Sequence, residues 1–317
     1  MTIQKKILTA IVFIVLVSDA IASAETRTVE IETTSSSIKI GEPLLMNICC
    51  HHQKPQISDI TGKRKLSIRI ERLYLRAKAG KKETEYILMP IRLADYEEQG
   101  LTYSGTIQVF YDDTEGLVFK EPGTYCIYVA TGSENAISNT LVINVLPASD
   151  LEEKALSILS EPNDFLFLLA GLCEKKEKAN KVSKLERIGE ECGETILAKW
   201  SAARLGIEYF RDFQKKHPSI EKFKAGLEND GIKEPLYQKA CEYLTTGAQL
   251  PDEFPIREEV LWNLCSIEHI RGNFDKTISL LDELSTKYPK GIYGQKASES
   301  KAQLLKEPKK QVLLLLR

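Results

Sequence analysis

The stretch LVINVLPASDLEEKALSIL, residues 141–159, contains the change in hydrophobic pattern that decides the predicted fold. Before Leu146-Pro147-Ala148, apolar residues recur at every second position, as on a strand with one buried face. After it, they recur at every third or fourth position, as on an amphipathic helix. Ser149-Asp150 has the composition of a helix N-cap. The sequence therefore predicts a strand-rich part up to residue 148 and a helical part from residue 149.

Short strands with turns between them are predicted throughout residues 25–148. Gly41-Glu42-Pro43 and Glu121-Pro122-Gly123 are typical turn sequences. Seven to nine short strands without a long helical pattern favour a β-sandwich. The strand-like segments are residues 28–32, 38–40, 44–50, 66–71, 106–110 and 140–145.

Two other stretches of this part resemble segments of a known family. Residues 121–129, Glu-Pro-Gly-Thr-Tyr-Cys-Ile-Tyr-Val, resemble the penultimate strand of bacterial immunoglobulin-like domains, and the Gly41-Glu42-Pro43 turn resembles the entry to their second strand. The resemblance covers about 120 residues and implies an immunoglobulin-like sandwich. Tyr125 adjoins Cys126, whereas antibody-type domains place the tyrosine two residues before the cysteine. Their inter-sheet disulfide is therefore not carried over, and a bond from Cys126 to Cys49 or Cys50 stays open.

The clearest unit of the helical part is a pair of helices predicted at residues 257–270 and 274–287, with Gly272 in the turn and Pro289 after the second helix. It resembles a tetratricopeptide repeat, which implies a helix-turn-helix that buries one stripe against its neighbours. Glu268 and Leu284 depart from the usual aromatic residue and alanine, so an ordinary α-hairpin remains the alternative. The residues that fit the spacing are Leu261, Leu264, Cys265, Thr277 and Leu281.

Residues 149–307 as a whole are predicted to form an irregular array of about eight helices, with at most three repeat-like units. The predicted fold class is thus multidomain β + α: an N-terminal immunoglobulin-like β-sandwich followed by an all-α tetratricopeptide-like helical-hairpin array. Trp200 and Trp262 are predicted to fill the core rather than stack on a ligand.

The two ends of the chain differ from both parts. Residues 1–24 resemble a secretory signal peptide, with Lys5 and Lys6, an apolar run over residues 7–17, and Ala22-Ser23-Ala24 at the cleavage position. A membrane anchor is the alternative, although the run is shorter than the roughly 20 residues that a spanning helix needs. Residues 308–317 are predicted to be a separate tail. It is either disordered, packed on its own domain, or a short docking segment for a partner or a membrane surface.

Charge and cysteine content restrict the class of protein. After cleavage, 41 basic and 44 acidic residues remain, a net charge of −3, which gives no basic excess for nucleic acid. All seven cysteines follow the cleavage position, and an oxidising compartment would permit disulfides. Cys173 and Cys192 are compatible with one such pair. The sequence predicts a periplasmic or extracellular location, with bacterial export favoured.

No recognised catalytic motif is found. The nucleophile-elbow, zinc-hydrolase, phosphate-loop and dinucleotide patterns are all missing from the sequence. Cys49-Cys50-His51-His52 has good metal-ligand types, but neighbours on a strand alternate sides, so no metal site is predicted. We therefore expect no enzyme activity, no cofactor and no metal.

The predicted function is that of an exported interaction or scaffolding protein whose helical array binds a protein or peptide partner. Asn263, Ser266 and His269 are the candidate partner-binding residues, because their spacing places them along one helix face. A solvated face without a ligand is the alternative for these three. The alternative function is a carbohydrate- or surface-binding module of the strand-rich part, using Tyr74, Tyr86, Tyr96 and Tyr103, or an enzyme without a recognisable motif.

Overall fold

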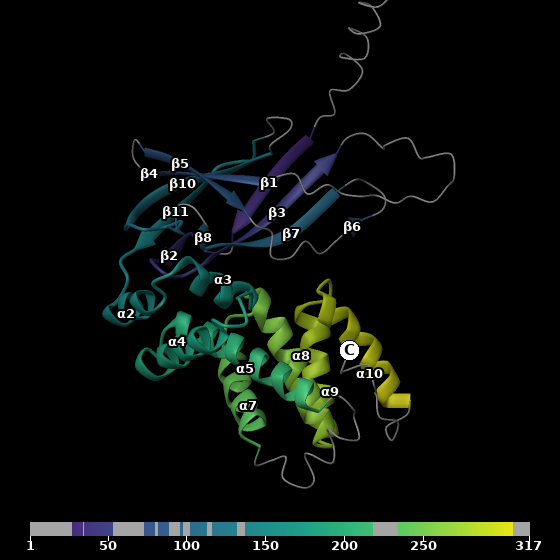
Figure 1. Ribbon diagram of the computed structural model, residues 1–317. Helices are drawn as coiled ribbons and strands as arrows, with labels where there is room; N and C mark the ends of the chain where they lie inside the picture. The colour runs from purple at the N-terminus through teal and green to yellow at the C-terminus, as the bar shows by residue number, and fades with distance from the viewer. Residues whose placement is uncertain are drawn as a thin grey trace, which may run out of the picture.

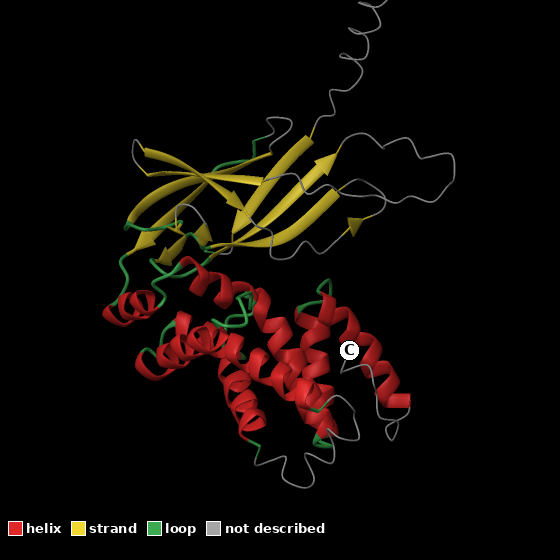
Figure 2. Cartoon of the chain, in the orientation of Figure 1, coloured by secondary structure: helices red, strands yellow, loops and turns green. Residues whose placement is uncertain are grey.

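The computed structural model describes residues 27–33, 35–52, 73–79, 82–88, 96–97, 102–112, 116–131, 137–217 and 234–306. Strands occupy the upper part of Figure 1 and helices the lower part, in the order in which they occur along the chain. Figure 2 shows this separation by colour. Among the described residues, no helix is both long and apolar enough to cross a membrane. The predicted signal peptide, residues 1–24, and the predicted tail, residues 308–317, lie outside the described part.

The described strands form two main sheets and one small ribbon. The first sheet has the order β1-β3-β7-β6, the second has the order β2-β11-β10-β4-β5, and β8 pairs with β9. All the paired strands are antiparallel except β2 and β11, which are parallel. The bounds are β1 Arg27–Thr33, β2 Ser37–Lys39, β3 Leu44–His52, β4 Leu73–Ala79, β5 Lys82–Leu88, β6 Tyr96–Glu97, β7 Thr102–Val109, β8 Tyr111–Asp112, β9 Gly116–Leu117, β10 Gly123–Thr131 and β11 Leu141–Leu146.

Alternation along these strands produces one apolar core. Leu44, Met46 and Ile48 of β3 are buried, and they join one cluster with Ile127 and Ile143 of the other main sheet. The residues between them point away from this core, as the period of two requires. Burial thus alternates along β3, although its sequence reads as a mostly apolar run rather than an alternating one.

The helices begin close to the predicted capping signals. Ser149 caps the first one: its hydroxyl accepts from the Glu152 backbone N–H, and the Glu152 carboxylate accepts from the Ser149 N–H at 2.7 Å. The bounds are α2 Asp150–Ile158, α3 Pro162–Ala170, α4 Lys178–Glu191, α5 Ile196–Lys216, α7 Pro235–Gly247, α8 Pro255–Ile270, α9 Phe274–Lys287 and α10 Ile292–Lys306.

Helices α5 and α7 pack unusually closely because glycines lie at their contact. A Cβ atom added to Gly206 of α5 would lie 2.7 Å from the Leu244 backbone nitrogen, and one added to Gly247 of α7 would lie 2.6 Å from Ala203 Cα. The absence of a side chain at both positions lets the two backbones approach.

A buried arginine holds the end of α3 against α5. Arg204 donates to the carbonyl oxygens of Leu168 and Leu169 at 3.1 and 2.6 Å, which satisfies acceptors that the helix end leaves unpaired. Burial lowers the pKa of Arg204 to about 10, and the guanidinium remains charged at neutral pH. The positive charge is favourable at a helix C-terminus.

The α8–α9 hairpin explains one departure from the predicted repeat pattern. Glu268 is buried and accepts from Asn273 Nδ2 at 2.6 Å and from Lys276 Nζ at 2.8 Å. These bonds tie the end of α8 to the start of α9 across the turn at Gly272. Cys265 and Thr277 are fully buried where the two helices cross.

The strand-rich and helical parts are joined by specific contacts. Phe110, between β7 and β8, packs against Phe165 and Trp200 with ring centroids 5.5 and 5.2 Å apart. Gly41, in the turn before β3, has a φ of +88°, and a Cβ there would lie 2.9 Å from Leu156 of α2. The helical core thus includes an aromatic side chain from the strand-rich part.

The predicted fold class requires correction. Among the described residues, helix is the main secondary structure, several strands have only two or three residues, and no immunoglobulin-like β-sandwich is evident. Phe110, which precedes the predicted boundary at residue 148, belongs to the helical core. The physical reason is that a hydrophobic period identifies strand and helix residues, whereas sheet size and core boundaries depend on long-range contacts. The domain boundary at residue 148 stays a prediction.

The cysteine pairings left open by the sequence are not formed by the described residues. Cys126 is a free thiol on β10 between the buried Tyr125 and Ile127, and Cys49 follows the buried Ile48 on β3, in the other main sheet. Both therefore face outward from opposite sheets, which rules out a Cys49–Cys126 bond. Cys173 and Cys192 are also free thiols. The side chain of Cys50 lies outside the described part.

Candidate functional site

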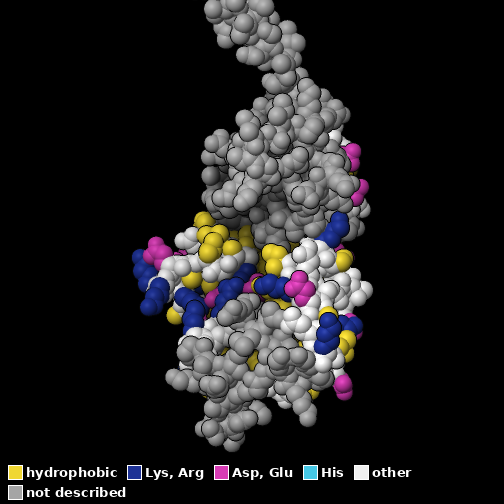
Figure 3. Space-filling model, turned by 90° about the vertical axis from the view of Figure 1, so that its right-hand side faces the viewer, with side chains coloured by type: hydrophobic (Ala, Val, Ile, Leu, Met, Phe, Trp, Pro, Cys, Tyr) yellow, Lys and Arg dark blue, Asp and Glu magenta, His cyan; other side chains and the backbone are white. Residues whose placement is uncertain are grey.

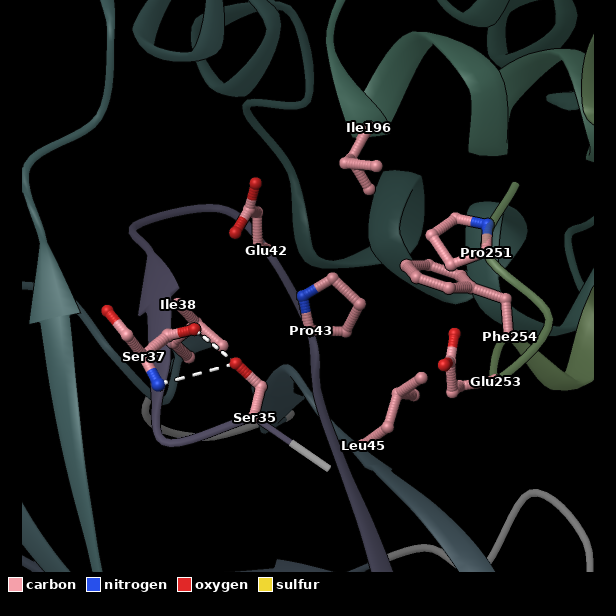
Figure 4. Close-up of a pocket in the computed structure, with 10 residues that line it drawn as sticks. All are labelled: Ser35, Ser37, Ile38, Glu42, Pro43, Leu45, Ile196, Pro251, Glu253 and Phe254. Carbon is pink, nitrogen blue, oxygen red and sulfur yellow. Dashed lines mark hydrogen bonds between the residues drawn. The ribbon is translucent and has the colours of Figure 1, made fainter. Parts of the chain in front are cut away.

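A pocket of about 300 Å³ lies where the strand-rich part meets the helices. Its strand-side wall comes from β2, the following turn and the start of β3, and its helix-side wall comes from the first residue of α5 and the segment before α8. Figure 4 shows the side chains of the two walls across the space between them. The lining residues are Ser35, Ser37, Ile38, Glu42, Pro43, Leu45, Ile196, Pro251, Glu253 and Phe254.

The helix-side wall is packed against a series of aromatic rings. Phe254 is 5% exposed and meets Trp200 edge to face, with ring centroids 5.7 Å apart. Trp200 in turn contacts Phe110. Such tilted and edge-to-face contacts stabilise beyond the area they bury. The pocket wall is therefore continuous with the core that joins the two parts of the molecule.

Apolar and partly exposed groups dominate the centre of the pocket. Leu45 and Ile196 are half-buried and Pro251 is exposed, so these three present apolar surface to whatever enters. Figure 4 places Pro43 between the two walls, facing Phe254 and Pro251. Six of the ten lining residues are apolar and four are polar or charged, so the pocket combines apolar surface with polar groups.

The outward edge of β2 is already hydrogen-bonded locally. The Ser37 N–H donates to Ser35 Oγ at 3.3 Å, and the same hydroxyl donates to the Ser37 carbonyl. The Lys39 N–H donates to Glu42 Oε2 at 3.0 Å, and the Glu42 N–H donates to the Lys39 carbonyl at 3.0 Å. An added strand would have to break these bonds, so the pocket favours insertion of a side chain over strand addition.

Two carboxylates stand on either side of the apolar surface. Glu42 and Glu253 are drawn at opposite sides of the pocket in Figure 4. Among the described residues, neither has an ion-pair partner, whereas the nearby Lys39 pairs with Glu152 at 3.2 Å. The lining contains no Lys, Arg or His. The electrostatic field at the pocket therefore favours a cationic group beside an apolar one.

The acidic clusters of the helical part have cationic partners of their own. Lys178 pairs with Glu208 at 3.0 Å and Asp212 at 2.9 Å, and Arg211 bridges Glu208 and Glu259 at 2.8 and 2.9 Å. Figure 3 shows one face of the molecule, where basic side chains of the helical part lie with acidic ones beside them. These pairs link α4, α5 and α8 and serve packing. Within the described ranges, no group of three or more His, Cys, Asp or Glu residues could hold a metal ion.

The predicted partner-binding residues lie on α8, away from the pocket lining. Asn263 is half-buried, and His269 meets the Phe274 ring at 5.9 Å. Ser266 is 1% exposed and donates to the Trp262 carbonyl at 3.0 Å, so its side chain faces the interior. The spacing of three residues predicted that the three side chains lie along one face of α8. Because of how α8 packs on its neighbours, Ser266 is buried whereas Asn263 and His269 are half-buried.

The other residues named from the sequence fall in three places. Trp200 and Trp262 are 0% and 4% exposed, as expected for core residues. Tyr74 and Tyr86 belong to one main sheet, and Tyr96 and Tyr103 to the other, so the four do not share a sheet. The side chains of His51 and His52 lie outside the described part.

The pocket residues had only weak signals in the sequence. Gly41-Glu42-Pro43 was recognisable as a turn, and Pro251 and Pro255 as residues that precede a helix. Nothing in the order of the residues indicated that residues 35–45 would meet residues 251–254, about 200 positions later. That meeting depends on the tertiary structure.

No protein-family model matches this chain, and no curated protein matches it either. Solved structures of a β-glucosidase from Listeria innocua are similar over 40% of this chain and 16–17% of their own length. The form with isofagomine has 18% identity and a TM-score of 0.22, and the structure without a named ligand has 18% identity and a TM-score of 0.23. The chain thus spans about a sixth of the length of those structures, and similarity at this level carries no conclusion about fold or activity.

Proposed function

We propose that this chain is an exported, non-enzymatic interaction or scaffolding protein of the bacterial periplasm or cell envelope. It binds a protein or peptide partner through the helical array, at the pocket that the array forms with the strand-rich part. The observation that carries the proposal is the pocket itself: half-buried and exposed apolar groups, with two carboxylates that have no ion-pair partner among the described residues.

The size and chemistry of the pocket support a side-chain binding site. A volume of about 300 Å³ is at the lower end of ligand pockets and suits one or two apolar side chains of a peptide. The hydrogen-bonded edge of β2 supports side-chain insertion in preference to strand addition. The firmly packed Phe254 wall supports binding without large rearrangement.

The export part of the proposal rests on the first residues. Two lysines, an apolar run and Ala22-Ser23-Ala24 follow the order of a secretory signal. The chain should therefore be recovered from the periplasmic fraction of a bacterial host with Glu25 as its first residue.

The binding part is tested by capture from envelope extract with three tagged forms of the chain. The wild type is compared with Pro251→Arg, which places a long cationic side chain at an exposed position of the pocket lining. Pro289→Arg is the matched control, because Pro289 is exposed after α9 and outside the lining. We expect one defined protein to be captured by the wild type and by Pro289→Arg, and at least tenfold less of it by Pro251→Arg.

Equal capture by all three forms would contradict the assignment of the pocket. Failure to enrich any protein after chemical crosslinking would contradict the interaction function. Circular dichroism and the unfolding midpoint of each variant ensure that a loss of capture does not reflect a loss of fold.

A further inference from the structure

The chain itself contains a segment that matches the pocket. Residues 309–317 read Lys-Lys-Gln-Val-Leu-Leu-Leu-Leu-Arg, so they have five consecutive apolar residues, three cations and no acidic residue. A bare run of this kind is normally covered by another apolar surface. We propose that Lys309–Arg317 docks in the pocket between the strand-rich part and the helices of its own molecule.

Apolar complementarity is the first support for this occupant. The leucines of the segment are branched side chains of the size that a pocket of about 300 Å³ accepts. The surface that they would cover comes from Leu45, Ile196 and Pro251, which are half-buried or exposed. Burial of two leucines there would remove apolar surface from water on both partners.

Charge complementarity is the second support. The segment has Lys309 and Lys310 before its apolar run and Arg317 after it. The pocket has Glu42 on one side and Glu253 on the other, with no cation in its lining. A segment with cations at both ends thus meets carboxylates at both sides, an arrangement that favours this sequence over an acidic or uncharged apolar one.

The proposal is tested by photo-crosslinking of the full chain. Leu314→p-benzoylphenylalanine places the reactive group in the middle of the apolar run, and the same replacement at Leu305, which is 62% exposed on α10, is the control. We expect the label at residue 314 to react with residues 35–45, 196 or 251–254. We expect the label at residue 305 to react elsewhere.

The charge contribution is tested on the same labelled chain. Glu253→Lys should lower the crosslink yield about fivefold, as expected for a lost ion pair that faces a new repulsion. Adding Lys309→Glu and Lys310→Glu should restore much of that yield. Glu194→Lys, an exposed carboxylate outside the lining, is the matched control and should leave the yield unchanged.

Crosslinks at other surfaces, or a yield that Glu253→Lys does not change, would overturn the proposal. A crosslink within single chains whose yield is insensitive to dilution would support the proposal, whereas crosslinked dimers whose yield declines on dilution would overturn it. This inference is separable from the proposed function. Loss of partner capture in Pro251→Arg without crosslinking from residue 314 would contradict only the inference, and crosslinking without a captured partner would contradict only the function.

Discussion

At the scale of single residues, the most informative groups are charges that the fold has buried. Asp164, 2% exposed, accepts from Lys181 at 2.8 Å, from Lys184 at 2.7 Å and from the Glu161 N–H at 3.0 Å. Burial alone would raise the pKa of Asp164, but the hydrogen bonds from the two lysines and the backbone outweigh it, so the pKa is lower than usual. The carboxylate therefore links the start of α3 to α4 in its ionised form.

Acid should weaken the fold through Asp164. A carboxyl group whose pKa is lower in the folded chain stabilises the fold fully above its unfolded pKa, here 3.8, and loses that contribution as the pH falls further. We expect stability in urea to decrease steeply below about pH 4. Asp164→Asn should lower the free energy of unfolding by about 3 kcal/mol at pH 7, because Lys181 loses a buried partner. It should also make the loss of stability below about pH 4 less steep.

Glu191→Gln is the control for Asp164→Asn. Glu191 pairs with Arg187 and Lys154 near the surface, so its replacement should cost much less. If the free energy of unfolding fell equally steeply below about pH 4 in the wild type and in Asp164→Asn, Asp164 would not be the source of the acid sensitivity.

At the scale of elements, the contact of α5 with α7 depends on two glycines, which have no side chain. Gly206 and Gly247 face the other helix at distances that no Cβ atom could occupy. Glycine inside a helix is ordinarily unfavourable, by roughly 1 kcal/mol relative to alanine. The fold tolerates that cost because the close approach lets Leu244 and Ala203 pack fully.

Opposite effects are therefore expected from two glycine-to-alanine changes in helices. Gly206→Ala should destabilise the chain by about 2 kcal/mol, because the new methyl group meets the Leu244 backbone nitrogen, which cannot move alone. Gly189→Ala in α4, where no atom lies within 4 Å of the added Cβ, should stabilise it by about 0.5–1 kcal/mol. Urea unfolding of the two variants measures both. The assigned α5–α7 packing would be refuted if Gly206→Ala were as stable as Gly189→Ala.

At the scale of the whole molecule, one aromatic residue from the strand-rich part is inserted into the helical core. Phe110 lies against Phe165 and Trp200, and Trp200 lies against Phe254 of the pocket wall. The junction, the pocket and the largest core therefore share the same side chains. A partner that binds the pocket would contact a wall that is packed against side chains from both parts of the chain.

Removing that side chain should loosen the junction. Phe110→Ala should cost about 3–4 kcal/mol, because it leaves a cavity between Phe165 and Trp200. It should also accelerate proteolysis near residues 146–149. The matched control is Phe274→Ala, at a position that is 46% exposed, where we expect a loss below about 1 kcal/mol. Urea unfolding and limited proteolysis measure the two effects, and similar values for both variants would contradict the proposed role of Phe110.

The local structure could be predicted from the sequence, whereas little of the tertiary assembly could. Hydrophobic period, capping residues and prolines placed several strands and the helices near their observed bounds: α9 begins and ends where predicted, and Ser149 caps α2. The strands β4 and β5 were not among the predicted segments, and the predicted strand at residues 66–71 lies outside the described part. These signals are local because hydrogen bonds within a helix and alternation along a strand involve near neighbours. The fold class and the candidate site were decided by the tertiary structure. Three features depend on contacts between residues that are distant in the sequence: the size of the sheets, the insertion of Phe110 into the helical core, and the position of Pro43 opposite Phe254. The hydrophobic period of a segment contains no information about such contacts.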